Sequence, residues 1–187
     1  MPPKVKITKE DIVKTATQLV RESGESAINA RAIANALNCS TQPIFCNFAS
    51  MDELRDAVAL NAYNIYTDFI KTEVESGKYP QYKAFGMAYV RFAKEEKELF
   101  KVLFMRARTE KSFVPTKDFD ESVEMIMKAN GVSRESAELM HLEMWTCVHG
   151  IGTILATSFL ELDFELISLM LTDIYQGIRA KHVSEEL

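Results

Sequence analysis

The stretch between Asn29 and Leu54, NARAIANALNCSTQPIFCNFASMDEL, decides the fold that the sequence predicts. Its first apolar residues have helical spacing, and Asn29 is a good N-cap, so we expect a short helix over residues 30–37. Asn38 follows at the point where a left-handed residue would end that helix, a conformation that asparagine adopts more easily than most residues. The stretch therefore begins with one short helix and a tight turn.

A second short helix is expected to open at Ser40, with Pro43 in its first turn, where a missing N–H costs little. Ser50 and Glu53 then form a capping box that begins a long helix reaching about Val74. Two short helices joined by a tight turn form a helix-turn-helix, a motif that places its second helix in the major groove of DNA.

The rest of the chain also favours helices, and the composition predicts an all-α fold. The 187 residues are 47% hydrophobic and include only 7 glycines and 5 prolines, and no long alternating run predicts a strand. Thr8 and Asp11 form a capping-box-like pair before the first helix, which Gly24 ends. After the fourth helix we expect helices over residues 80–96, 97–108, 119–130, 133–160 and 163–181, a loop over Thr109–Lys117 and a frayed tail over 182–187.

Two domains are expected. A helix-turn-helix domain (residues 1–53) is joined through the long fourth helix to a larger helical bundle (residues 54–187). The net charge of −5 does not indicate nucleic-acid binding, although residues 1–50 hold six basic and four acidic side chains. The electrostatic footprint of the first domain is therefore weak, with Lys4, Lys6 and Lys9 expected in a basic arm.

The cysteines and the apolar segments predict a reduced, cytoplasmic protein. Cys39, Cys46 and Cys147 are odd in number and form no C-x-x-C motif. Cys39 and Cys46 flank the second short helix, but no nearby positive charge would activate them, so we expect structural roles. No signal segment and no run of about 18 apolar residues is present. No cofactor motif or metal-ligand spacing is found either.

The order of motifs in the first third of the chain resembles that of the TetR family of bacterial transcriptional regulators. The match covers about residues 7–60. It consists of a first helix ending in glycine, then R-x-I-A, then S-x-x-x-[LI]-[YF]-x-x-F and a capped fourth helix. The residues that carry it are Thr8, Ile12, Ala16, Leu19, Gly24, Arg31, Ile33, Ala34, Leu37, Ser40, Ile44, Phe45, Phe48 and Leu54. A shorter match in the second half consists of Trp145, His149 and Gly150.

This resemblance implies about nine helices, a homodimer built mainly by the last two, an effector pocket in the C-terminal bundle and a palindromic DNA operator. Three positions depart from the family pattern. Asn38 replaces the turn glycine, Phe45 stands where tyrosine is usual, and Met51 stands where lysine often begins the fourth helix. The second and third changes remove groups that would bind phosphate.

The DNA-reading residues are expected on and beside the second short helix, which has no charged side chain. Arg31 can pair with guanine through two hydrogen bonds, and Gln42 can do the same with adenine. Pro43 can contact a thymine methyl group, and Thr41 can make either kind of contact. Phe45 and Asn47 are expected at the DNA backbone, with Ser40 binding phosphate through its helix N-terminus.

The second domain is rich in methionine and aromatic side chains, which suit a pocket for a largely apolar effector. The ordinary alternative for each of these residues is core packing, and His149 is expected in the core or an interface. Candidate ligand-binding residues are Tyr66, Phe85, Tyr89, Phe104, Met125, His141, Met144 and Trp145.

The last two helices have broad apolar faces that could form a four-helix dimer interface, or alternatively an intramolecular core. Candidate dimerisation residues are Val148, Ile151, Leu155, Ile167, Met170, Leu171, Ile174 and Ile178.

The sequence thus predicts a ligand-responsive transcriptional repressor that binds a palindromic operator as a homodimer. One alternative is a related protein that has lost DNA binding and acts as a ligand-binding or protein-interaction module. A helical enzyme is not expected, because the sequence lacks G-x-S-x-G, H-E-x-x-H and P-loop motifs.

Overall fold

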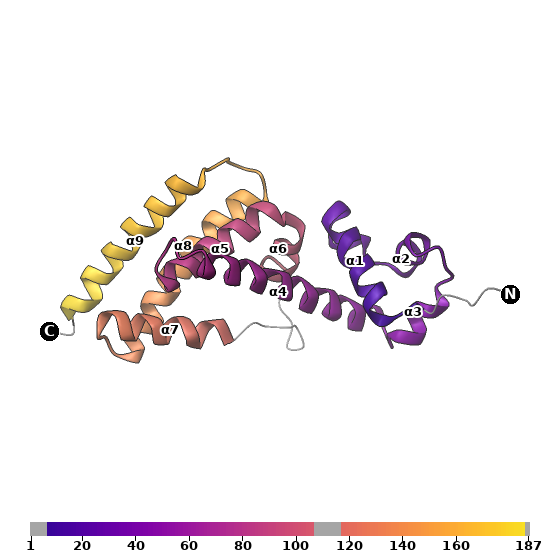
Figure 1. Cartoon of the computed structure of the whole chain (residues 1–187), viewed down its shortest axis with the longest axis horizontal. Coiled ribbons are helices and arrows are strands. Elements are labelled where there is room, and N and C mark those ends of the chain that lie inside the picture. The colour runs from indigo at the N-terminus through magenta and orange to yellow at the C-terminus, as the bar shows by residue number, and fades with distance from the viewer. Residues whose placement is uncertain (1–6, 107–116, 186–187) are drawn as a thin grey trace. The chain divides into compact units, whose positions relative to one another are not determined.

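The computed structural model describes residues 7–106 and 117–185 of the chain (Figure 1). Over these ranges it consists of nine α-helices and one short 3₁₀ helix, Glu25–Ala27, with no strand. The all-α prediction is therefore confirmed. The loop expected over Thr109–Lys117 falls largely outside the described residues, and the helix after it begins at Lys117.

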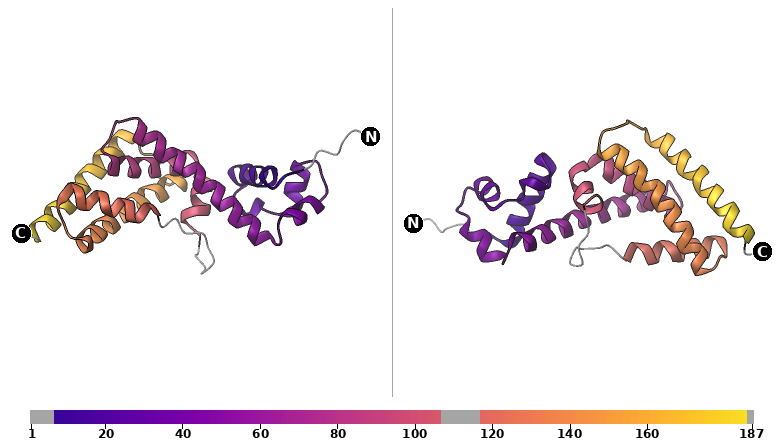
Figure 2. Two further views of the ribbon diagram at one scale, coloured as in Figure 1. Left: turned by 60° about the horizontal axis from the view of Figure 1, so that its bottom comes forward. Right: turned by 180° about the vertical axis from the view of Figure 1, so that it is seen from behind.

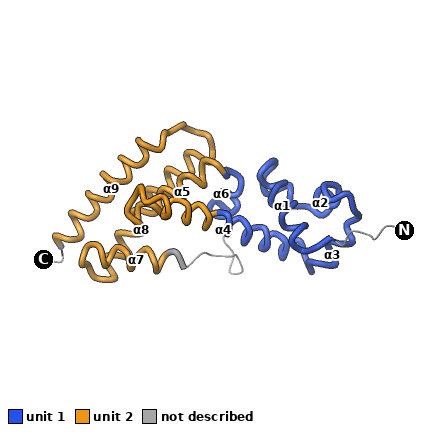
Figure 3. The backbone as a smooth tube through the Cα atoms, viewed as in Figure 1, with its two compact units in different colours: residues 1–65, 96–113 blue, residues 66–95, 114–187 orange. Residues whose placement is uncertain are grey.

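The chain divides into two compact units (Figure 3). Unit 1 contains Met1–Ile65 and Glu96–Phe113, and unit 2 contains Tyr66–Glu95 and Val114–Leu187. The division passes through the middle of one continuous helix, α4 (Met51–Glu75). Each unit therefore includes part of α4 and has its own buried apolar residues.

Unit 1 is built on α1 (Lys9–Ser23), which packs against α2 (Ala30–Ala36), α3 (Gln42–Asn47) and α6 (Lys97–Phe104) (Figure 2). The Thr8–Asp11 capping box and the end of α1 at Gly24, with φ 77°, confirm the sequence prediction. The core of this unit includes Ile12, Ala16, Val20, Ile33, Ile44, Phe48, Leu54 and Val58.

The helix-turn-helix has the predicted cap at its start, where the Asn29 side chain accepts a hydrogen bond from Ala32 N. Asn38 has a φ of 51°, which confirms the left-handed turn after α2. The prediction that the next helix opens at Ser40 is wrong, because α3 begins at Gln42 with Thr41 at the N-cap position. An N-cap side chain at Ser40 would bond to the N–H of Gln42 or Pro43, and proline has no N–H.

The beginning of α4 follows the predicted capping box with one change. Glu53 N donates to Ser50 Oγ at 3.1 Å, as expected. The carboxylate of Glu53 accepts from Ala49 N at 2.7 Å and so extends the cap by one residue. At the other end of the helix, Gly77 has a φ of 63°, a conformation that glycine adopts at no steric cost.

In unit 2, α8 (Arg134–Ala156) is the central helix. It packs against α5 (Gln81–Glu95), α7 (Lys117–Asn130) and α9 (Phe164–Glu185) (Figures 1 and 2). The residues of α8 that are buried in these contacts recur every three or four positions, which is the spacing of one helix face. They include Ala137, Met140, Met144, Val148, Ile151 and Leu155.

Two helix ends in unit 2 differ from the sequence prediction. Helix α8 ends at Ala156 rather than near residue 160, and the Thr157 hydroxyl donates to Thr153 O at 2.7 Å. The helix ends because Ser158 has a left-handed φ of 55°, and Phe159 N and Ser158 N donate to Ile154 O and Leu155 O, as in a Schellman motif. Helix α9 continues to Glu185, so the prediction of a frayed tail is wrong for residues 182–185. His182 is buried there, and its Nε2 lies 3.0 Å from Glu143 Oε2.

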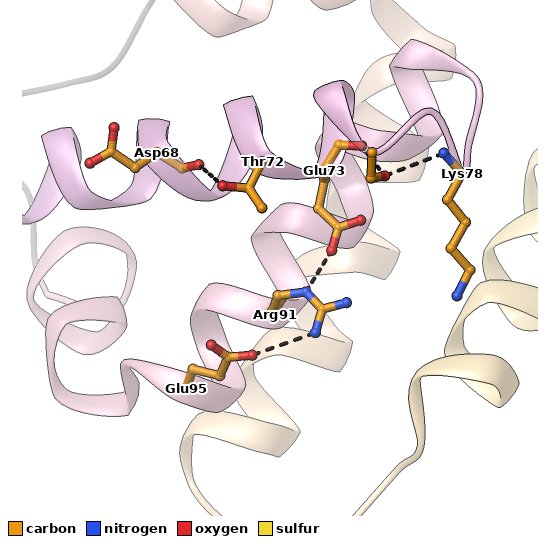
Figure 4. Close-up of polar contacts among 7 residues, drawn as sticks. Asp68, Thr72, Glu73, Lys78, Arg91 and Glu95 are labelled. Carbon is orange, nitrogen blue, oxygen red and sulfur yellow. Dashed lines mark hydrogen bonds and ion pairs between the residues drawn. The ribbon is translucent and has the colours of Figure 1, made fainter.

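The C-terminal end of α4, which is part of unit 2, is joined to α5 through a partly buried ion cluster on Arg91 (Figure 4). Arg91 Nε donates to Glu73 Oε1 at 2.5 Å, and Arg91 Nη1 lies 3.5 Å from Glu95 Oε1. The guanidinium also lies 4.3 Å from the ring centroid of Phe164, at the start of α9. Burial lowers the pKa of Arg91, but hydrogen bonding and charge interactions with Glu73 and Glu95 raise it by more. The guanidinium therefore stays charged and joins three helices.

The two carboxylates on Arg91 are expected to contribute unequally to stability. The Glu73 side chain is 7% exposed and that of Glu95 is 50% exposed. Glu73→Gln should lower the free energy of unfolding by about 1–2 kcal/mol, because it weakens a charge-assisted bond in a nearly dry position. Glu95→Gln, the matched control, should cost less than about 0.5 kcal/mol. Urea unfolding measures both, and equal costs would contradict this view of the cluster.

Candidate functional site

The outer surface of α3 is uncharged and contains one large exposed aromatic ring. Ile44 and Phe48 point into the core of unit 1. On the opposite side of the helix, Gln42 and Cys46 are exposed, and Phe45 is 55% exposed. This surface therefore offers one amide, one thiol and one apolar ring to a partner.

The other predicted contact residues of α3 are partly enclosed. Thr41, Pro43 and Asn47 are half-buried, whereas Ser40 is exposed. Asn47 Nδ2 donates to Pro43 O at 2.7 Å, so this amide group is tied to its own helix. Thr41 makes no side-chain cap bond. A helix of only six residues has a small dipole, so phosphate binding by its N-terminus has little basis.

Charge near the helix-turn-helix is carried by few groups. Arg31, in the first turn of α2, is exposed and forms no ion pair within the described part of the chain. Lys14 on α1 is exposed in the same way. Arg21 instead donates to both Glu96 oxygens, from Nε at 2.8 Å and Nη2 at 2.7 Å, and this raises its pKa. Arg31 is thus available to a DNA base or phosphate, whereas Arg21 is held by a carboxylate.

The basic arm expected at Lys4, Lys6 and Lys9 is wrong for Lys9, and the other two lysines lie outside the described residues. Lys9 is the first residue of α1, and its Nζ donates to Glu53 Oε1 at 2.8 Å. The same amino group lies 4.6 Å from the ring centroid of Phe48. The Lys9 and Ala49 bonds lower the pKa of Glu53. A carboxylate therefore occupies the N-terminus of α4, where a phosphate would otherwise find favourable charge.

Seven of the eight predicted ligand-binding residues belong to unit 2, and Phe104 belongs to unit 1. Phe104 packs against Phe100, with ring centroids 5.2 Å apart. In unit 2, Tyr66, Tyr89 and Met144 are buried. The residues that are partly or mostly exposed are Phe85, Met125, His141 and Trp145.

Two tyrosine–histidine hydrogen bonds connect α5 to α8. Tyr82 Oη lies 3.0 Å from His141 Nδ1, and Tyr89 Oη lies 2.8 Å from His149 Nδ1. The ring of Trp145 stacks on His149, with centroids 4.9 Å apart and planes 13° apart. Tyr82 and His149 belong to this group, although Tyr82 was not predicted to bind a ligand and His149 was expected in the core or an interface. Their i, i+7 and i, i+8 spacings on α5 and α8 could have indicated the pairing.

Burial determines the proton state of these pairs. Burial lowers the pKa of His141 and of His149, and burial raises the pKa of Tyr82. The Nδ1 atom of a neutral histidine can accept a hydrogen bond from the tyrosine hydroxyl. Both pairs are therefore neutral at pH 7, which suits the surroundings of an apolar ligand.

The predicted dimerisation residues divide into buried and partly exposed groups. Five of them are buried within the single chain: Val148, Ile151, Leu155, Ile167 and Leu171. Ile178 packs against the core cluster around Ile126 and Met140. Met170 and Ile174 are partly exposed.

A different set of apolar residues is exposed on α8 and α9. Leu139 and Leu142 on α8, and Leu166 and Leu169 on α9, are between 42% and 59% exposed. Added Cβ atoms at Gly150 and Gly177 would meet no other atom within 4 Å. Periodicity could not separate these residues from the core set, because α8 has apolar residues on both faces.

Within residues 7–106 and 117–185, neither a candidate metal site nor a candidate membrane span is found. No group of three or more histidine, cysteine and acidic side chains is placed to hold a metal ion. No helix in the same ranges is long and apolar enough to cross a membrane.

Comparisons with known proteins identify the fold. A protein of unknown function from Rhodococcus sp. RHA1 is 18% identical with a TM-score of 0.75, over 94% of this chain and 97% of that one. A TetR-like transcriptional regulator from the same organism is 16% identical with a TM-score of 0.67, over 94% and 96%. A TetR variant from Acinetobacter baumannii AYE, in complex with minocycline, is 13% identical with a TM-score of 0.60, over 95% and 99%. No protein-family model and no curated protein sequence matches significantly.

The lowered pKa of His141 predicts a pH-dependent stability. The folded state keeps this ring neutral below the ordinary pKa of 6.5, whereas the unfolded chain takes up the proton. Stability should therefore be complete above about pH 6.5 and fall as the pH decreases toward the folded-state value. His141→Asn keeps a hydrogen-bond acceptor near Nδ1 but does not titrate. Its melting temperature should decline less than that of the wild type between about pH 7.5 and pH 5. An unchanged decline would contradict the assignment.

Proposed function

We propose that this chain, which has the fold of TetR-like regulators, is a ligand-responsive transcriptional repressor that binds a palindromic operator as a homodimer. In this proposal residues 1–53 read DNA, and residues 54–187 bind the effector and dimerise. The observation that carries it is the outer surface of α3. That surface is exposed and uncharged, and it belongs to a well-packed helix-turn-helix that also holds an exposed, unpaired Arg31.

The dimer proposal rests on the exposed leucines of α8 and α9. Four large apolar side chains outside the core favour a partner surface, because their burial removes apolar area from water. Gly150 and Gly177 lie in open space on these helices and would allow the backbones of two copies to approach closely. Two α3 helices held by such a dimer about 34–36 Å apart would match one turn of DNA.

The effector is proposed to be largely apolar and to bind in unit 2. The Acinetobacter neighbour was solved with minocycline, a precedent for a small molecule in this fold. In this chain the Tyr82–His141 and Tyr89–His149 pairs are neutral polar groups set among apolar side chains, an arrangement that would orient a ligand. The ligand would change the DNA-binding equilibrium only by its differential affinity for two states of the protein.

The direct test is selection of bound sequences from random duplex DNA, followed by a gel-shift titration of the enriched sequence. An enriched inverted repeat bound by a dimer supports the proposal. If nothing is enriched and non-specific binding is absent at low salt, the alternative of a ligand-binding module without DNA binding holds. The Lys9–Glu53 pair motivates that alternative, because it removes one cation from the DNA-facing charge.

Arg31 is the residue whose loss should reduce sequence-specific binding most. Arg31→Ala should weaken operator binding by about 30-fold or more, because a dimer would lose two arginine–guanine pairs, one in each half-site, at about 1–3 kcal/mol each. Arg31→Lys keeps the charge and loses the planar fork, so specific binding should fall while non-specific binding persists. Lys14→Ala is the control for the change in charge. Equal losses in Arg31→Ala and Lys14→Ala, on operator and random DNA alike, would contradict base reading.

The oligomeric state should depend on the exposed leucines of α8. Leu142 is 54% exposed, so Leu142→Glu should leave each folded chain intact and convert the dimer to a monomer by placing a charge in the interface. Leu60 is also exposed but lies on α4. Leu60→Glu is therefore the matched control and should remain dimeric. Light scattering after size-exclusion chromatography measures both, and a dimeric Leu142→Glu variant would refute this interface.

A further inference from the structure

We infer that Phe45 reads thymine through the C5 methyl group and so determines which base pairs the operator contains opposite α3. The inference rests on the proposed DNA-binding function and adds the chemistry by which its sequence is chosen. It also changes the role expected for Phe45 from the sequence, which was contact with the DNA backbone.

The ring of Phe45 is exposed on the outer surface of α3. The Phe45 side chain is 55% exposed, whereas Ile44 and Phe48 beside it on α3 are almost completely buried. The ring is therefore not needed to fill the core of unit 1. It lies on the part of α3 that also exposes Gln42 and Cys46, and half-buried Pro43 flanks that surface.

The chemistry of the Phe45 ring limits which groups of a DNA base pair it can contact. A phenyl ring has no hydrogen-bond donor or acceptor, so it cannot bond to phosphate or to a polar base edge. Against guanine, adenine or cytosine in the major groove it would cover donors and acceptors and leave them unsatisfied, which costs free energy. The thymine methyl is the one apolar feature that an unmodified base pair presents in that groove. Among the base edges in that groove, the thymine methyl is therefore the favourable partner for burial of the ring.

No charged side chain on α3 competes with Phe45 for contact with a base. The side-chain amide of Asn47 is held against its own helix because one of its two N–H groups donates to Pro43 O. Glu53 caps α4 and binds Lys9, so these two groups satisfy each other. The described surface of α3 thus leaves Gln42 and Phe45 as the large side chains that can distinguish bases. Phe45 contributes the apolar part of the readout.

The test uses the selected operator with each thymine replaced in turn by deoxyuridine, which removes the methyl and leaves the base-pairing edge intact. The full-length wild type should lose about fourfold in affinity at one position per half-site, the value of one buried methyl group. A cytosine at that position should weaken binding, and 5-methylcytosine should recover part of the loss. Deoxyuridine differs from thymine only at C5, and 5-methylcytosine differs from cytosine only at C5. Each comparison therefore isolates the methyl group.

Protein variants connect that position to Phe45. Phe45→Ala should bind the unmodified operator more weakly and show no further loss with deoxyuridine, and Phe45→Tyr should keep the methyl dependence because it keeps the ring. Leu60→Ala, which removes an exposed apolar side chain elsewhere in the same unit, should behave as the wild type. Circular dichroism confirms that each variant is folded.

The outcomes separate this inference from the function on which it rests. If the wild type binds the operator but deoxyuridine has no effect at any position, Phe45 lies on the sugar–phosphate backbone and the inference is overturned. A methyl dependence that persists in Phe45→Ala overturns it also, and assigns the contact to Pro43 or Cys46. Failure of the wild type to bind any DNA refutes the proposed function itself.

Discussion

Helix α4 is the constraint on which both halves of the molecule depend. Its 25 residues form one continuous hydrogen-bonded helix, and the division between the two compact units falls inside it. Its first turns complete unit 1, where Glu53 caps the helix and Leu54 enters the core. Its last turns complete unit 2, where Glu73 binds Arg91. Without α4, unit 1 would lose the buried Leu54 and Val58, and unit 2 would lose the buried Tyr66.

Unit 1 satisfies most of its charges internally and leaves a nearly neutral reading surface. Lys9 is paired with Glu53 and Arg21 with Glu96, so Arg31 is one of few exposed cations available to DNA. Phosphate contacts supply most non-specific affinity, and a surface of this kind has few of them. In the proposed function, DNA recognition would therefore depend more on base contacts and on the spacing of two copies than on total charge. This is why an exposed phenylalanine on α3 matters in the proposal.

Helix starts were predictable from sequence wherever a cap is made by neighbouring residues. Thr8 and Asn29 make the expected cap bonds to the backbone within three residues, and Ser133 and Asp163 cap α8 and α9 in the same way. The errors occurred where a local cap competes with other chemistry. Pro43 lacks one of the two N–H groups that a cap at Ser40 could have bonded, and α8 ends before Ser158, which has a left-handed φ of 55°. The extension of α9 to Glu185 could not be read from sequence, because burial of His182 beside Glu143 comes from a helix nearly 40 residues away.

The sequence alone determined the all-α class, the helix-turn-helix, the left-handed Asn38 and the absence of charge on α3, since each depends on residues close together in the chain. Tertiary structure decided which apolar residues are covered. Val148 and Leu155 are in the core of the chain, whereas Leu142 on the same helix is exposed. Packing against α5, α7 and α9 covers one side of α8 and leaves the other uncovered. Tertiary structure also decided which charges are paired, because the partners of Lys9, Arg21 and Arg91 lie 44, 75 and 18 residues away in the sequence.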